Sequence, residues 1–216
     1  MPSRNPEVAA FQRRRIIEAA TEVFEEKGFS GASMDQIAAA AGFTKRTIYA
    51  FFLSKSAIQL AIVLDGFLSL RDRLGAVASA SLSFEENARG FLNAVSSEQT
   101  SQPYRTASML QFAPPKTCGD DPASLAEFAL VAQINAVGVE LDGLMVQAFE
   151  AGRQAGKVRD GIDDRLAGMV LWAAMSAVVS LERSKADYLA SDLGLTDDEF
   201  LAQACDILLS GIVKGV

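Results

Sequence analysis

Apolar residues recur at three- and four-residue spacing through most of this chain, which is the pattern of amphipathic helices. The clearest early example is the set Ile16, Ala20, Val23 and Phe24, in a helix expected from about Val8 to Lys27. No run alternates apolar and polar residues as a half-buried strand would. Because only six prolines interrupt the 216 residues, the pattern predicts an all-α protein.

Capping residues divide the chain into nine expected helices, three before residue 53 and six after it. Ser33 followed by Gln36 has the pattern of a capping box, Gly42 ends the helix that this box begins, and Thr44 starts the next helix. Ser54, Ser83 with Glu86, and Thr196 with Glu199 mark three later starts in the same way. The expected ranges are 8–27, 34–41, 45–51 and 55–77, then one from Ser83 to 97, 104–112, 122–154, 163–189, and a last helix from Thr196.

The charge is divided unevenly along the chain. The formal net charge is −7, yet residues 1–55 hold eight basic and six acidic residues and so carry +2. The other residues hold twelve basic and twenty-one acidic side chains and carry −9. Because binding to nucleic-acid phosphates draws on Lys and Arg, only the N-terminal part is suited to approach DNA.

Composition excludes several classes of chemistry. The chain has no histidine, which rules out His-based metal sites and Ser-His or Cys-His catalysis. Cys118 and Cys205 are too few for a disulfide framework, and no signal peptide precedes the first helix, so we expect a cytoplasmic protein. The longest uncharged run, 166–181, is shorter than the ~20 residues of a membrane span and is interpreted as a buried helix. We expect no cofactor, no metal and no membrane partner.

The helices at 34–41 and 45–51, joined by a tight turn, form a candidate helix-turn-helix. In that motif the second helix lies in the major groove of DNA, and its first residues reach base edges. Lys45 and Arg46 can donate to guanine O6 and N7, whereas hydroxyl and ammonium groups around them suit phosphates. The expected DNA-binding set is Ser33, Thr44, Lys45, Arg46, Thr47, Tyr49 and Lys55. From the bare pattern, an ordinary helix pair that reads no DNA is equally consistent.

A longer ordered set of residues surrounds this motif. It consists of Phe24 with Lys27-Gly28-Phe29, SMDQIA at 33–38, AGF at 41–43, TKRTIYAFF at 44–52, and Ser54-Lys55. From about Arg14 to Val63 the chain thereby resembles the N-terminal domain of TetR-family transcriptional regulators. Arg46, Ala50 and Phe51 depart from the usual pattern of that family, so the resemblance does not carry over a base preference.

The resemblance implies a helix-turn-helix DNA-binding domain at 1–53 and a six-helix ligand-binding and dimerisation domain at 54–216. It also implies a homodimer whose affinity for a palindromic operator falls when a small molecule binds, and hence a repressor. Small residues on the helix at 163–189 permit close approach of a second copy in a four-helix bundle, although they could instead pack inside one subunit. The expected dimer interface is Val170, Ala173, Ala174, Ala177, Leu181, Leu201, Ala204 and Leu208.

The ligand pocket implied by the resemblance would lie among helices of the second domain. Its candidate lining is mostly apolar and aromatic, with Arg71 and Arg105 as the basic exceptions, so we expect an apolar or aromatic effector. Taken singly, each candidate is more typical of ordinary core than of a ligand contact. The full set is Phe67, Arg71, Tyr104, Arg105, Met109, Phe112, Phe128, Trp172 and Met175.

Two other functions compete with a regulator. A helical-bundle enzyme would use carboxylates such as Glu86, Glu127, Glu140, Asp142 and Glu150, but the absence of Glu-x-x-His pairs excludes the usual di-iron bundle. A protein-interaction module could retain the helix-turn-helix without reading DNA. We expect no enzyme, and salt-dependent, sequence-preferring DNA binding would separate a regulator from the interaction module.

Overall fold

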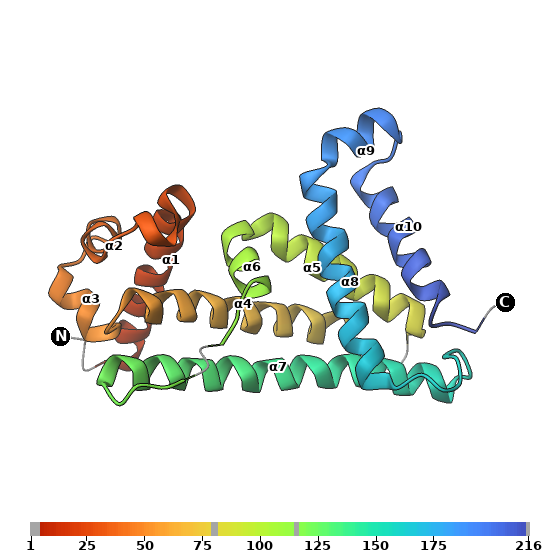
Figure 1. Ribbon diagram of the computed structural model, residues 1–216, viewed down its shortest axis with the longest axis horizontal. Coiled ribbons are helices and arrows are strands. Elements are labelled where there is room, and N and C mark those ends of the chain that lie inside the picture. Colours follow the sequence, from red (N-terminus) through yellow and green to blue (C-terminus); the bar gives the residue numbers. More distant parts are fainter. Residues whose placement is uncertain (1–4, 79–81, 115–116, 215–216) are drawn as a thin grey trace. The chain divides into compact units, whose positions relative to one another are not determined.

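The structure, a computed structural model, describes residues 5–78, 82–114 and 117–214, and within these ranges it contains ten helices and no strand (Figure 1). The predicted all-α class is therefore confirmed. The helices are α1 (Pro6–Gly31), α2 (Met34–Ala41), α3 (Lys45–Phe51), α4 (Lys55–Val77), α5 (Phe84–Ser101), α6 (Pro103–Leu110), α7 (Pro122–Gln154), α8 (Asp164–Ser184), α9 (Ala186–Asp192) and α10 (Asp197–Ser210).

The predicted count of nine helices is wrong by one. The helix expected at 163–189 is two helices, because the backbone leaves helical geometry at Lys185 (φ −129°, ψ 18°). No proline or glycine stands there, so the sequence carries no local signal for this break. Seven of the ten described helices therefore follow residue 53, rather than the six expected.

The capping predictions for the motif are confirmed. The Ser33 hydroxyl accepts the Gln36 N–H, and the Gln36 side chain accepts the Ser33 N–H in return, which completes the capping box of α2. Gly42 has φ 70°, a left-handed conformation that glycine adopts without steric cost, and it closes α2. Thr44 then accepts the Thr47 N–H at 3.2 Å and starts α3. These caps fix both ends of the turn between the two helices.

Contacts within the chain group it into two compact units. The first is Met1–Phe67 with Gln102–Ala136, and the second is Leu68–Ser101 with Val137–Val216. Helices α4 and α7 contribute residues to both units. The predicted functional division into 1–53 and 54–216 is a different division and stays a prediction.

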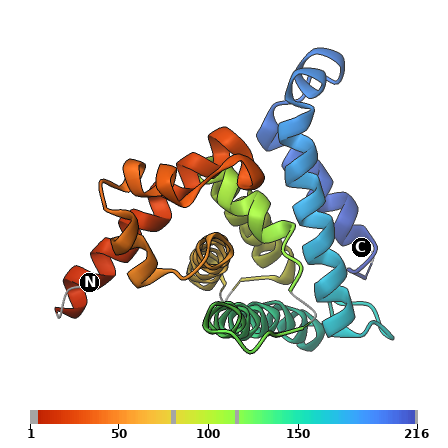
Figure 2. The ribbon, with the colours of Figure 1, turned by 60° about the vertical axis from the view of Figure 1, so that its left-hand side comes forward.

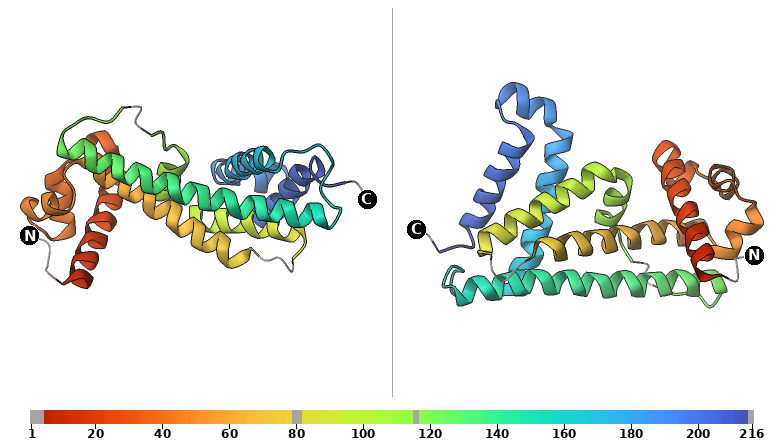
Figure 3. Two further views of the ribbon diagram at one scale, coloured as in Figure 1. Left: turned by 90° about the horizontal axis from the view of Figure 1, so that it is seen from below. Right: turned by 180° about the vertical axis from the view of Figure 1, so that it is seen from behind.

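The first unit is built on the apolar faces of α1 to α4. Phe24 from α1, Ile37 from α2, Ile48 from α3 and Ile58 from α4 are all buried in one cluster, and Figure 2 shows α2 and α3 beside α1. Tyr104 of α6 and Leu130 of α7 pack against the same cluster. The first halves of α4 and α7 run side by side here (Figures 1 and 3). Segments distant in sequence therefore stabilise the helix-turn-helix.

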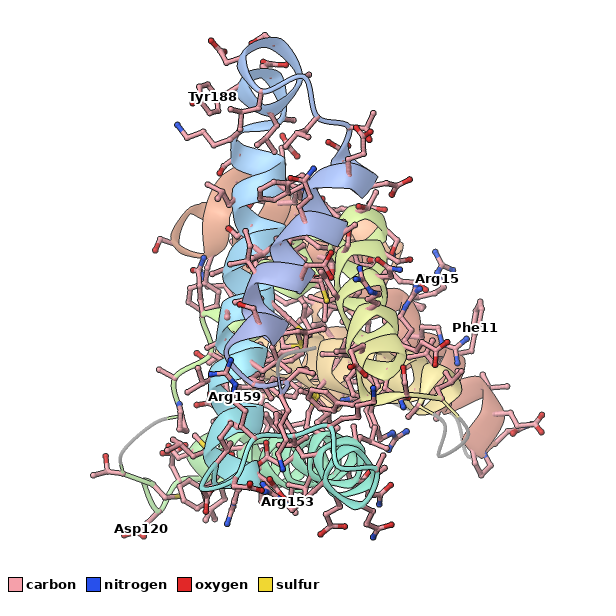
Figure 4. The ribbon with its side chains drawn as sticks, turned by 90° about the vertical axis from the view of Figure 1, so that its right-hand side faces the viewer. Phe11, Arg15, Asp120, Arg153, Arg159 and Tyr188 are labelled. Carbon is pink, nitrogen blue, oxygen red and sulfur yellow. The ribbon has the colours of Figure 1, made fainter. Side chains whose placement is uncertain are left out.

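The second unit contains a three-helix group in which α5, α8 and α10 contact one another. Its interior holds Phe91 from α5, Met175 from α8 and Cys205 from α10. At the turn from α7 to α8, Arg153 donates to the Ile162 carbonyl, and Arg159 donates to the Ser210 and Val213 carbonyls (Figure 4). These arginines hold the turn and the chain beyond α10 in place.

The buried carboxylate of Glu98 in this second unit has partners on the neighbouring helix. Glu98 of α5 is 1% exposed and lies 2.7 Å from Nε of Arg73, while the Ser69 hydroxyl donates to it at 2.9 Å. A buried charge is stable only with a partner, and here both partners, Arg73 and Ser69, belong to α4. The contact therefore joins the end of α4 to α5.

The uncharged run at 166–181 is not the buried helix that its composition suggests. Val170 is 60% exposed and Leu166 is 61% exposed, whereas Leu171 and Met175 on the other face are buried. Helices α7 and α8 are both long and apolar enough to cross a membrane by length and composition alone, with 28% of each apolar window buried. On α8 the exposed apolar residues form a stripe on the surface of the unit.

Candidate nucleic-acid interface and ligand groove

Helix α3 has one inward and one outward face. Of its seven described residues, Ile48 alone is buried, while Lys45, Arg46 and Tyr49 are exposed. An isolated helix of this length is unstable in water. The burial of Ile48, together with Phe52 just beyond the helix, therefore holds the outward face in position.

Lys45 begins α3 and is already engaged within the subunit. Its ammonium donates to Oδ2 of Asp35 on α2 at 2.9 Å, and this hydrogen bond together with the charge of Asp35 raises the pKa of Lys45. The pair is well exposed, with 51% of the Lys45 side chain and 68% of the Asp35 side chain accessible. Exposed ion pairs are weak, so the ammonium remains available to a phosphate or a base.

Lys55 lies against the end of α1. Its ammonium donates to the carbonyl of Ala32 at 2.7 Å and to the carbonyl of Phe29, and it lies 4.5 Å from the centre of the Phe29 ring. Carbonyls at a helix end attract a cation. Lys55 therefore ties the start of α4 to the end of α1, a role that the sequence interpretation did not include.

Two arginines of α1 brace the helix pair. The guanidinium of Arg15 donates to the Ala41 carbonyl at 3.0 Å and lies over the Phe43 ring, and that of Arg13 lies 5.1 Å from the centre of the Phe52 ring. Stacking of a guanidinium on an aromatic ring is a favourable cation–π contact. These side chains hold α1 against the ends of α2 and α3.

The seven predicted DNA-binding residues all fall in the first unit. Five of them are exposed, and Thr47 and Lys55 are partly buried. The hydroxyls of Thr44 and Thr47 lie 2.9 Å apart at the start of α3, and Ser33 caps α2. Their role in DNA binding stays a prediction.

A groove of about 620 Å³ lies in the same unit, between the end of α1, the first turns of α4, α6 and the start of α7. Tyr104 donates to Oε1 of Gln59 at 2.9 Å across it, and burial raises the pKa of the Tyr104 phenol against the opposing hydrogen bonds to Ser108 and Gln59. Glu127 also lines it and accepts the Ser54 hydroxyl at 2.6 Å.

The predicted ligand residues are divided between the two units. Tyr104 and Phe112 line the groove, and Phe67 lies in edge contact with Phe112 at 6.5 Å between ring centres. Met109 is buried, Arg105 is partly buried and Phe128 is exposed in the first unit. Arg71, Trp172 and Met175 belong to the second unit, where Arg71 pairs with Asp72 and Glu140.

Of the twelve described residues that line the groove, the predicted ligand set contained Tyr104 and Phe112; Phe29, Gln59 and Glu127 are among the ten that it did not include. Phe29 follows Gly28, where the backbone leaves helical geometry (φ 70°, ψ 160°) as the predicted stop at this glycine implied, within the range Pro6–Gly31 of α1. The sequence pattern indicated Glu127 only as one of several carboxylates that a helical-bundle enzyme could use. No local pattern brings a residue of α7 beside Ser54, because that contact spans 73 positions.

The predicted dimer residues lie mainly on α8. Val170, Ala173, Ala177 and Leu181 are exposed along one side of that helix, and Ala174 is partly buried. On α10, Ala204 and Leu208 are partly buried, whereas Leu201 is 5% exposed and belongs to the core of its unit. The large exposed apolar residue of α10 is instead Ile207, which is 72% accessible.

Three of the five carboxylates considered for an enzyme have other partners. Glu86 accepts the Ser83 N–H in the cap of α5, which lowers the pKa of Glu86. Glu127 accepts from Ser54, and Glu140 pairs with Arg71. Across the described ranges, no group of three or more Cys, Asp or Glu side chains is placed to hold a metal ion.

Together, the helices, caps and exposed basic face define an all-α protein that carries an N-terminal helix-turn-helix. Residues 16–62 match the family described as bacterial regulatory proteins, tetR family. The N-terminal segment of the chain is therefore similar to the DNA-binding region of that family.

Two curated bacterial regulators are similar over the N-terminal region. The HTH-type transcriptional regulator UidR of Escherichia coli K12 is 44% identical over 53 residues, which make up 24% of this chain and 27% of UidR. The putative mycofactocin biosynthesis regulator MftR of Mycobacterium tuberculosis is 36% identical over 85 residues, covering 33% of this chain and 43% of MftR. The chain thus matches less than half the length of either relative.

The likeness in fold extends over nearly the whole chain. The transcriptional regulator FadR from Bacillus subtilis, solved in complex with stearoyl-CoA, superposes with a TM-score of 0.71 over 92% of this chain and 98% of that chain. The sequence identity is 19%, so the likeness establishes the shared fold alone.

Proposed function

We propose that this chain is a cytoplasmic, dimeric, ligand-responsive transcriptional regulator that binds DNA in a sequence-specific way, and that it acts as a repressor. The observation that carries this proposal is the outward face of α3, where Lys45, Arg46 and Tyr49 are exposed while Ile48 anchors the helix. The match of residues 16–62 to the tetR family of bacterial regulatory proteins supports the same role. The chain would have no catalytic function.

In the proposed complex, α3 lies in the major groove. Arg46 can donate two hydrogen bonds to guanine, and Lys45 can reach a base edge or a phosphate by leaving Asp35. Tyr49 and the N-terminus of α2 at Ser33 would hold phosphates on either side. Lys55 would contribute by fixing the end of α1, or by turning its ammonium from the Ala32 carbonyl to a phosphate.

A dimer would supply two reading helices about one DNA turn apart on a palindromic operator. The exposed apolar stripe of α8, with Val170, Ala173, Ala177 and Leu181, and Ile207 on α10 support a two-fold interface. Large exposed apolar side chains in a row are typical of such surfaces.

An effector would act by binding more tightly to a conformation that fits the operator poorly. A ligand shifts such an equilibrium only by its difference in affinity for the two states. A small apolar or aromatic effector is supported by the aromatic lining of the groove at Tyr104 and Phe112, and the stearoyl-CoA complex of the similarly folded FadR is consistent with an apolar ligand.

Selection of bound fragments from sheared genomic DNA tests the function. The purified full chain should enrich a small set of fragments that contain an inverted repeat, with affinity that falls steeply as salt rises. Arg46→Ala should lose the enrichment. The matched control is Lys157→Ala, which removes an exposed cation from the second unit and should keep the enrichment. Retention of the same fragments by Arg46→Ala and Lys45→Ala would refute the assigned face.

A further inference from the structure

The groove in the first unit differs from a plain gap in the core because of what lines it. Phe29, Tyr104 and Phe112 contribute aromatic rings, and Leu60 and Val63 add aliphatic surface. Its volume of about 620 Å³ lies within the usual range for sites of small organic ligands. An aromatic molecule of a few fused rings would therefore fill it.

The charge of the lining is one-sided. Among the described residues that line the groove, Glu127 is the one charged side chain, and the polar groups beside it are neutral amides and hydroxyls such as Gln59, Ser56 and Ser108. The lining contains no described Lys or Arg. A carboxylate beside aromatic faces attracts a cation through both ion pairing and cation–π contact, and it repels an anion.

We propose that the groove binds an aromatic molecule that carries an ammonium group, with the ammonium at Glu127 and the rings between Phe29, Tyr104 and Phe112. This inference rests on the proposed function for its regulatory consequence and narrows the effector from apolar or aromatic molecules in general to aromatic amines. The binding itself does not depend on DNA.

Glu127 connects the groove to the start of α4, the helix that follows α3. Its carboxylate accepts the Ser54 hydroxyl at 2.6 Å, and that hydroxyl accepts the Ala57 N–H at 2.9 Å as the cap of α4. An ammonium bound at Glu127 competes for this carboxylate and so weakens the tie between α7 and the start of α4. Phe52, at the end of α3, lies two residues before Ser54.

Phe29 provides a second connection. Its ring lines the groove and also lies 4.5 Å from the Lys55 ammonium, which is held by carbonyls at the end of α1. Ligand rings that stack on Phe29 compete with the Lys55 ammonium for the face of this ring. The ligand therefore disturbs the contact between α1 and α4 that supports the helix-turn-helix, and DNA and amine should bind antagonistically.

Three probes of one shape test the charge preference: pyrenemethylamine, pyrenemethanol and pyrenecarboxylate, titrated into the full chain and followed by pyrene fluorescence. The amine should bind about tenfold more tightly than the alcohol, as expected for one charge-assisted contact. The carboxylate should bind more weakly than both. Equal affinities for the three probes, or preference for the carboxylate, would overturn the proposal.

Two variants locate the site. Glu127→Gln should abolish the preference for the amine while keeping affinity for the alcohol, and the matched control Glu150→Gln, at an exposed position of the same helix, should keep the preference. Ala107→Trp fills the groove from α6 and should block all three probes, whereas Ala190→Trp on α9 should not. Binding that survives Ala107→Trp, or a preference that survives Glu127→Gln, places the site elsewhere and refutes the assignment.

The regulatory part has its own measurement. With a DNA fragment selected by the wild-type chain, saturating amine should weaken binding about fivefold or more, which is the lower range of allosteric couplings, and Ala107→Trp should remove the effect. Amine binding without any change in DNA affinity would overturn the coupling. Failure to select DNA at all would count against the proposed function but leave the fluorescence test of the groove intact.

Discussion

Ile48→Ala tests whether one buried side chain positions the reading helix. Ile48 is 0% exposed and is the buried residue among those described in α3. The substitution removes three carbon groups, which corresponds to ~2.4 kcal/mol of lost burial at ~0.8 kcal/mol for each. The residual cavity places the total in the range of about 2–5 kcal/mol.

Because α3 is short, most of this loss should act on its docking rather than on the whole protein. A cost of ~3 kcal/mol converts to a change of roughly 100-fold in the docking equilibrium. We expect at least a tenfold loss of affinity for a selected DNA fragment in fluorescence anisotropy, with faster amide hydrogen exchange in α3. The helical circular dichroism should change little.

Ile62→Ala is the matched control, because Ile62 is equally buried in the same cluster but belongs to α4. It should lower the midpoint of thermal unfolding while leaving DNA affinity nearly unchanged below that midpoint. Equal losses of DNA affinity in both variants would show a general loss of stability. Affinity within twofold of wild type for Ile48→Ala would refute the anchoring argument.

Three further outcomes follow from other contacts. Val170→Asp places a charge on the exposed stripe of α8, and analytical ultracentrifugation should show a shift from dimer to monomer; a dimer of unchanged strength would exclude this face. Asp35→Asn releases Lys45. The slope of the logarithm of the DNA-binding constant against the logarithm of salt concentration should then steepen by about 0.9 for each added phosphate contact, while an unchanged slope would mean that Lys45 contacts no phosphate. Iodoacetamide should label exposed Cys118 before buried Cys205, since burial raises the pKa of the Cys205 thiol; mass spectrometry that finds Cys205 labelled first would contradict the packing of α10.

Local chemistry made most of the helical architecture predictable. Ser33, Gly42 and Thr44 each act within a few residues of their own position, so the turn between α2 and α3 could be placed closely from sequence. Lys185 shows the limit, because nothing in its immediate sequence marks the end of α8. That helix end depends on packing, which the periodicity of one helix does not encode.

The candidate sites were less predictable because their contacts span long separations. The outward face of α3 followed from the burial of Ile48, which the helical period indicates directly. The pairing of Ser54 with Glu127 and of Tyr104 with Gln59 joins segments 73 and 45 positions apart. Sequence spacing carries no information on which helical carboxylate would lie beside a given cap.

The composition of the first unit has a practical meaning for building hybrid regulators. A chimera joined at residue 53 would transplant α1 to α3 but leave behind Tyr104, which lies 6.1 Å from the Phe24 ring between ring centres, and Glu127, which holds the Ser54 cap. The new partner would have to supply equivalent surfaces by chance. A graft that carries 1–67 together with 102–136 keeps those contacts intact, so the useful module for exchange is discontinuous along the chain.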